Sequence, residues 1–168
     1  MLKTMIVAAV ALCLSVPAWA DLTVSFYEGA PKDRFEIVYS GACPLKNAVI
    51  EIDLGASAAG LILDTTQRGA GVSVFQPLEF VSGREKLNAT PQATDGDTRI
   101  RLAVDALASG EKIVFTTDVD DTKGTGPTMI SGAEISGAEV ALEQNDQRSR
   151  AVFDTSATAT IATKTCNA

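Results

Sequence analysis

Apolar and polar residues alternate along much of this chain, a pattern typical of half-buried β-strands. The clearest case is the segment from Gly110 to Thr122. Side chains of an extended segment point alternately to opposite faces, so one face of this strand is predicted to be buried. That face would hold Ile113, Phe115, Thr117 and Val119. The opposite face of the strand ends in Asp118 and Asp120, and Asp121 follows directly in the sequence.

Several shorter segments show the same alternation and are separated by glycine, proline, asparagine and aspartate. No stretch of useful length has apolar residues at helical spacing. The sequence therefore predicts an all-β fold, an immunoglobulin-like antiparallel β-sandwich of seven to nine strands. Besides the segment above, strands are expected at residues 22–26, 34–40, 47–54, 61–63, 72–75, 98–105 and 151–163.

A five-residue motif occurs twice in tandem, as Ile130-Ser-Gly-Ala-Glu134 and Ile135-Ser-Gly-Ala-Glu139. An offset of five places equivalent residues on opposite faces of a straight strand. We therefore expect a bulged strand, or one bent at glycine, across this repeat.

The first twenty residues have the features of a secretory signal peptide. Lys3 is followed by an apolar run from Met5 to Leu14, and Ala18-Trp19-Ala20 forms a small-x-small cleavage site. The apolar run is shorter than a membrane-spanning helix requires. We therefore expect cleavage before Asp21, a single domain over residues 21–168 without a membrane span, and a periplasmic or secreted location.

The charge balance argues against some classes of partner. The chain has 14 basic and 21 acidic residues and no histidine, which gives a formal charge of −7. Only Lys3 is lost with the leader, so the expected mature charge is −8. Such an acidic chain is poorly suited to nucleic acid or anionic lipid and better suited to cations.

Cys43 and Cys166 are the cysteines that remain after removal of the leader. Two cysteines so far apart in sequence, in an oxidising compartment, are predicted to form a disulfide between an early loop and the C-terminal strand. The chain-entropy model assigns such a long loop about 4 to 5 kcal/mol of stabilisation. The alternative is two free thiols.

Acidic residues are concentrated in three predicted loops. Loops of a β-sandwich collect at its two ends, so carboxylates distant in sequence can meet there. Ca²⁺ binds six to eight oxygen atoms, which glycine-rich acidic turns can supply, although the spacing does not fit an EF-hand. A calcium site and ordinary solvated charges are the two interpretations. The candidate ligands are Glu28, Asp33, Asp95, Asp97, Asp118, Asp120 and Asp121.

Two alternatives to a binding role are open. A carbohydrate-active enzyme would use Asp118 or Asp120 with Glu28 as paired acid and base, but nothing in the spacing specifies this chemistry. The chain has no histidine for a catalytic triad or a zinc-bound water, so we expect a non-enzymatic protein. A structural subunit would pair through an edge strand, and the threonine-rich segment from Thr155 to Thr163 suits that role.

Four segments of the mature chain together resemble a known group. They are Glu28-Gly-Ala-Pro-Lys-Asp-Arg-Phe35, Asp95-Gly-Asp97, Asp118-Val-Asp-Asp-Thr122 and the tandem repeat. The chain is similar in these segments to small exported bacterial proteins labelled "aggregation factor core". By analogy with animal cell-adhesion proteoglycans, the resemblance implies calcium-dependent adhesion, with a protein or glycan at the cell surface as the partner. It transfers no catalytic or binding residue.

Overall fold

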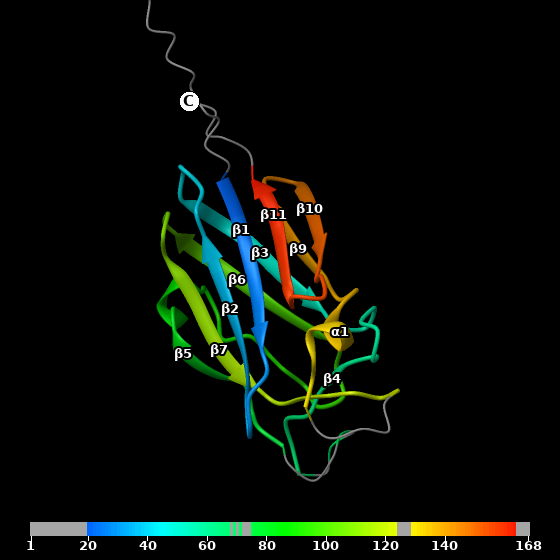
Figure 1. The fold of residues 1–168 in the computed structure, drawn as a ribbon. Coiled ribbons are helices and arrows are strands. Elements are labelled where there is room, and N and C mark those ends of the chain that lie inside the picture. Colours follow the sequence, from blue (N-terminus) through cyan, green and yellow to red (C-terminus); the bar gives the residue numbers. More distant parts are fainter. Residues whose placement is uncertain (1–19, 68, 70, 72–74, 124–128, 164–168) are drawn as a thin grey trace, which may run out of the picture.

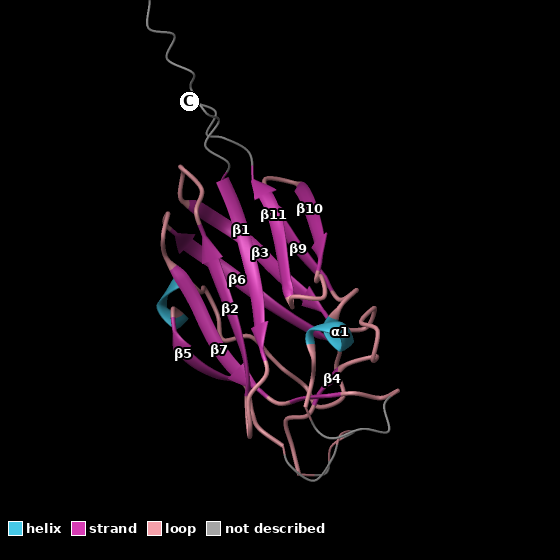
Figure 2. Ribbon diagram, viewed as in Figure 1, coloured by secondary structure: helices cyan, strands magenta, loops and turns pink. Residues whose placement is uncertain are grey.

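The computed structural model describes residues 20–67, 69, 71, 75–123 and 129–163. Strands dominate these residues, and helix is confined to two short turns (Figure 2). The elements are β1 (Ala20–Tyr27), β2 (Asp33–Tyr39), β3 (Leu45–Asp53), β4 (Ile62–Leu63), β5 (Glu79–Ser82), the 3-10 turn η1 (Arg84–Lys86), β6 (Arg99–Leu107), β7 (Lys112–Thr117), β8 (Val119–Asp120), α1 (Gly132–Ile135), β9 (Glu139–Gln144), β10 (Gln147–Val152) and β11 (Thr158–Thr163).

The strands form two main sheets around a shared core (Figure 1). The five-stranded sheet has the order β11-β1-β2-β7-β5, and the four-stranded sheet has the order β10-β9-β3-β6. β4 and β8 form a separate two-stranded sheet. Each of these pairings is antiparallel, which confirms the predicted all-β sandwich. The immunoglobulin-like label stays a prediction.

The strand number differs from the predicted seven to nine, since the described residues contain eleven. Part of the difference comes from β4 and β8, which are two residues long and pair only with each other. Alternation cannot be recognised over two residues, so strands this short give no periodic signal.

Alternation along the strands sets which side chains enter the core. The four side chains that were predicted to face inward in the segment 110–122 are all buried. They are those of Ile113, Phe115, Thr117 and Val119. Phe35 on β2 and Phe115 on β7 stack with their ring centroids 5.2 Å apart. Apolar side chains from both main sheets form one continuous cluster, and removing this surface from water is the main stabilising contribution.

The tandem repeat does not form the predicted bent strand. α1 runs from the first copy into the first residue of the second, and β9 begins only at Glu139, the last residue of the second copy. The Glu134 carboxylate accepts hydrogen bonds from the Ser131 backbone N–H at 2.7 Å and from its hydroxyl at 2.6 Å. Ser-x-x-Glu is the signature of a helix capping box, which the strand interpretation overlooked.

One end of the sandwich brings together chain segments that are far apart in sequence (Figure 1). The Leu63 N–H donates to the Asp97 carbonyl at 2.9 Å, and the Asp64 N–H donates to the Asp118 carbonyl at 3.1 Å. β2 begins at this end with Asp33, and β7 finishes there. We call it the acidic end, defined by Asp33, Asp64, Asp95, Asp118 and Asp120.

Some predictions fall partly or wholly outside the described residues. The leader is outside them except for Ala20, as are most of the strand expected at 72–75 and Cys166. Cys43 lies between β2 and β3 and is disulfide-bonded. Because Cys166 lies outside the described residues, the pairing of these two cysteines stays a prediction. Within the described part of the chain, no helix has the length and apolar character needed to span a membrane.

Candidate metal centre

Asp64, which directly follows β4, is the most unusual residue of the acidic end. Its side chain is 0% exposed, and among the described residues neither carboxylate oxygen has a hydrogen-bond partner. Its backbone is fixed on both sides, because its N–H donates to Asp118 and its carbonyl accepts the N–H of Gln76, both at 3.1 Å. A buried carboxylate without a hydrogen bond is costly, so this side chain requires a proton or a cation.

Two further carboxylates flank Asp64. The Oδ1 atoms of Asp64 and Asp95 lie 2.4 and 2.5 Å from the position that a Cβ on Gly69 would occupy. The Oδ2 atoms of Asp64 and Asp120 lie 2.5 and 2.0 Å from the corresponding position on Gly71. Glycine at 69 and 71 therefore allows the backbone to pass close to both pairs of oxygens, where any larger residue would collide with them.

The surroundings of Asp64 disfavour its charged form. Burial, followed by the charge of Asp120 and the proximity of Asp95, raises the pKa of Asp64 from 3.8 to about 7. The neighbouring carboxylates, by their negative charge, also favour a cation in place of the proton.

Asp95 and Asp120 come from different elements. Asp95 lies in the loop before β6, and its Oδ1 accepts hydrogen bonds from the N–H groups of Thr65 and Thr66 at 2.8 and 3.0 Å. Asp120 ends β8 and is only 4% exposed. The two residues therefore fix the segment after Asp64 and the end of its partner strand.

A second acidic group lies nearby but differs in its hydrogen bonding. The buried Asp33 carboxylate accepts hydrogen bonds from the N–H groups of Gly29 at 3.2 Å and Val119 at 3.1 Å. Burial, with smaller contributions from Asp118 and Glu28, raises the pKa of Asp33 to about 7 despite these bonds. Burial and the charge of Asp120 raise the pKa of Asp118 to about 6.

The structure places the seven predicted ligands unequally. Asp95 and Asp120 lie beside Asp64, and Asp118 and Glu28 are electrostatic neighbours of Asp33. Asp97 is exposed and contributes its carbonyl to Leu63, while Asp121 is half-buried after β8.

Sequence reasoning missed Asp64, although two signals were present. An aspartate directly follows the apolar run Leu61-Ile-Leu63, and the glycines of Gly69-Ala-Gly71 come shortly after it. An acidic residue at the end of a buried strand, next to a glycine-rich turn, fits a site that the backbone must approach closely.

The donor set near Asp64 consists of oxygen atoms. Among the residues that the structure describes, no group of three or more histidine, cysteine or carboxylate side chains is already arranged to hold a metal ion. A cation at Asp64 therefore requires small movements of the flanking carboxylates, together with carbonyl or water oxygens. Carboxylate and carbonyl oxygens suit hard cations such as Ca²⁺ rather than zinc or copper.

No protein-family model matches this chain. No curated protein matches it either. The function is therefore argued from the site itself and from the sequence.

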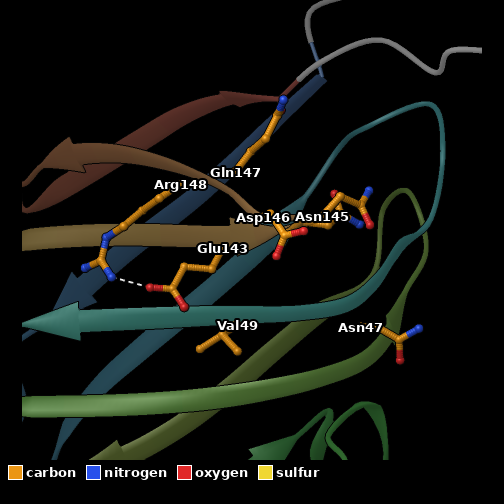
Figure 3. A pocket seen from close by; sticks show the side chains of 8 residues that line it. Asn47, Val49, Glu143, Asn145, Asp146, Gln147 and Arg148 are labelled. Carbon is orange, nitrogen blue, oxygen red and sulfur yellow. Dashed lines mark hydrogen bonds and ion pairs between the residues drawn. The ribbon is translucent and has the colours of Figure 1, made fainter.

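Two pockets lie away from the acidic end, on the outer side of the four-stranded sheet. One, of about 380 Å³, surrounds the β9–β10 turn, and Figure 3 shows Glu143 and Arg148 paired beside Val49. The other, of about 420 Å³, is lined by Glu51, Arg101 and neighbouring charged residues.

The charged groups around these pockets satisfy one another. Glu51 receives hydrogen bonds from Arg101 at 2.6 Å and Arg148 at 2.9 Å. Burial opposes ionisation of Glu51, but Arg148 and Arg101 hold its pKa below its usual range. This arrangement is a cross-strand ion-pair network on an exposed sheet face, and among its described residues no buried side-chain atom lacks a hydrogen-bond partner.

Proposed function

We propose that this protein is an exported, non-enzymatic binding or adhesion module whose acidic end is stabilised by calcium. The calcium part is carried by Asp64, which lies beside Asp95 and Asp120 as a fully buried carboxylate without a hydrogen-bond partner in the part of the chain that the structure describes. A divalent cation would supply the missing partner and neutralise carboxylates that otherwise repel one another.

The export and adhesion parts are supported by the sequence. Three features are consistent with a location outside the cytoplasm. They are the predicted leader, the predicted disulfide between Cys43 and Cys166, and the acidic charge. The resemblance to "aggregation factor core" proteins supports calcium-dependent attachment to a protein or glycan at the cell surface. A β-sandwich is a suitable rigid scaffold for loops that make such an attachment.

Thermal unfolding of the mature chain tests the calcium part. Protein treated with chelator and dialysed is titrated with CaCl₂ to millimolar concentration at constant ionic strength. A ligand that binds only the native state, at one hundred times its Kd, adds about 2.7 kcal/mol, so we expect Tm to rise by about 5 to 10 °C. An unchanged Tm at millimolar calcium would refute the calcium part. Asp105→Asn, which removes an exposed carboxylate on β6, is the matched control and should keep the full shift.

The adhesion part needs its own assay. Beads coated with the mature protein are mixed with cells or with glycan-coated surfaces, in calcium and in chelator. Attachment in calcium that disappears in chelator supports the proposal. Attachment that is absent under both conditions on every surface tested argues against an adhesive role.

A structural subunit is the second candidate, because β11 lies at the edge of the five-stranded sheet. An edge strand presents backbone groups that a strand of another copy can pair with. Light scattering over a range of concentrations tests this candidate. A monomer at every concentration would exclude self-pairing in solution, whereas a stable dimer would favour the structural role.

A further inference from the structure

We infer that the acidic end holds a single enclosed cation at Asp64, between Asp95 and Asp120, and that this site selects Ca²⁺ over Mg²⁺. The inference rests on the proposed function, which requires calcium at the acidic end without specifying its ligands. It names those ligands, the number of ions and the basis of selectivity.

The choice between the two acidic groups follows from their hydrogen bonds. Asp33 already accepts hydrogen bonds from Gly29 and Val119, so its oxygens are stabilised by the protein itself. Within the described part of the chain, no donor reaches either oxygen of Asp64, and both residues are buried. The free energy gained by adding a cation is therefore greater at Asp64, which predicts one ion rather than two.

The enclosure of the site determines which cation it favours. The side chains of Asp64 and Asp120 are 0% and 4% exposed, which leaves little access for the water molecules that Mg²⁺ retains. Ca²⁺ accepts an irregular set of six to eight oxygens and gives up its water more readily. Gly69 and Gly71 leave the space beside these carboxylates free of side chains that would collide with their oxygens.

Hydrogen bonds with the main chain hold Asp64 and Asp95 in place. Asp95 accepts the N–H groups of Thr65 and Thr66, which directly follow Asp64 in the chain. Asp64 is itself held by main-chain bonds to Gln76 and Asp118. These bonds fix the backbone at Asp64 and tie Asp95 to the residues that follow it, so ordering these two residues adds little to the cost of binding.

An enclosed ion of this kind stabilises the fold and does not bridge to a partner. Calcium would then affect adhesion indirectly, by holding the acidic end in the conformation that a partner binds. A partner would not need to supply a ligand to the ion.

Isothermal titration calorimetry with CaCl₂ and with MgCl₂ on the chelator-treated mature protein tests the inference. The expected result is one calcium per chain, with a Kd at least tenfold lower than that for magnesium. Asp64→Asn should weaken calcium binding at least tenfold. Asp33→Asn is the matched control, a buried aspartate of the other acidic group, and should change the Kd less than threefold.

Gly71→Ala provides a second variant that keeps every carboxylate. Its Cβ would lie 2.0 Å from the Asp120 oxygen and 2.5 Å from an Asp64 oxygen, so calcium binding should weaken at least tenfold. Circular dichroism in chelator shows whether each variant is folded, and the comparison is made on those that are.

The outcomes separate this inference from the proposed function. Absence of calcium binding to the wild-type protein would overturn both. Calcium binding that persists in Asp64→Asn and Gly71→Ala but is lost in Asp33→Asn would overturn the assignment to Asp64 and leave the proposed function intact. Two ions per chain, or equal affinity for magnesium, would overturn the single-ion and selectivity parts.

Discussion

The Asp33 carboxylate accepts a hydrogen bond from the backbone N–H of Val119 at 3.1 Å, which joins the start of β2 to β8. β8 ends one residue later in Asp120, one of the carboxylates beside Asp64. This bond therefore connects the two acidic groups through β8, although only one of them is assigned a cation.

Replacing Asp33 by alanine should lower the free energy of unfolding by about 1 to 3 kcal/mol, because the buried N–H of Val119 loses its acceptor. Asp33→Asn keeps one oxygen acceptor and should cost less. Urea unfolding of both variants measures the difference. Equal loss in the two variants would show that the hydrogen bond is not the cause.

Without calcium, the protein should become less stable as the pH rises from 5 to 8. The pKa values of Asp33 and Asp64 are about 7 in the folded protein, against 3.8 for an ordinary aspartate. Between these values the native state binds more protons than the unfolded state, so stability is fully present at low pH and falls as pH rises.

We expect a loss of about 2 to 4 kcal/mol over this range. Carboxylates with lowered pKa values, such as Glu51 and Glu134, titrate below pH 5 and do not oppose the trend in this range. Urea unfolding in chelator at several pH values measures the change. Stability that rises from pH 5 to pH 8 would contradict it.

Glu51 is expected to stabilise the four-stranded sheet rather than bind a ligand. Glu51→Gln should lower the free energy of unfolding by about 1 to 2 kcal/mol, because a buried acceptor of two arginine hydrogen bonds loses its charge. Arg150→Gln, at an exposed pair with Glu139, should cost less than about 1 kcal/mol. A larger loss at Arg150 than at Glu51 would contradict the network described here.

The capping box at α1 gives a local prediction. Ser131→Ala removes the N-cap side chain and should destabilise the protein by about 0.5 to 2 kcal/mol. Ala133→Ser, at an exposed position within α1, is the control and should have less than half that effect. No loss in Ser131→Ala would mean that packing of Ile135 alone fixes this turn.

Alternation was enough to predict the fold because it reports burial directly. The four side chains predicted to face inward between Ile113 and Val119 are all buried. The helical turn at α1 was not predicted, because its signal is a hydrogen-bonding pattern between Ser131 and Glu134 rather than a hydrophobic period.

The acidic end was predicted only in part. Surface loops rich in aspartate drew attention to Asp95 and Asp120, which do lie together. Asp64 was overlooked because its neighbours in sequence are apolar, and its significance depends on burial and on missing hydrogen bonds. Such properties arise from tertiary contacts, which alternation along the chain does not report.

The central claim is that Asp64 is a carboxylate held in readiness for calcium. The most direct test compares the urea unfolding of wild-type protein and Asp64→Asn at pH 8, each in chelator and in millimolar CaCl₂. In chelator, Asp64→Asn should be at least as stable as wild type, because it removes a buried negative charge. In calcium, wild type should become the more stable of the two. A variant that is less stable than wild type in chelator and gains as much from calcium would contradict the claim.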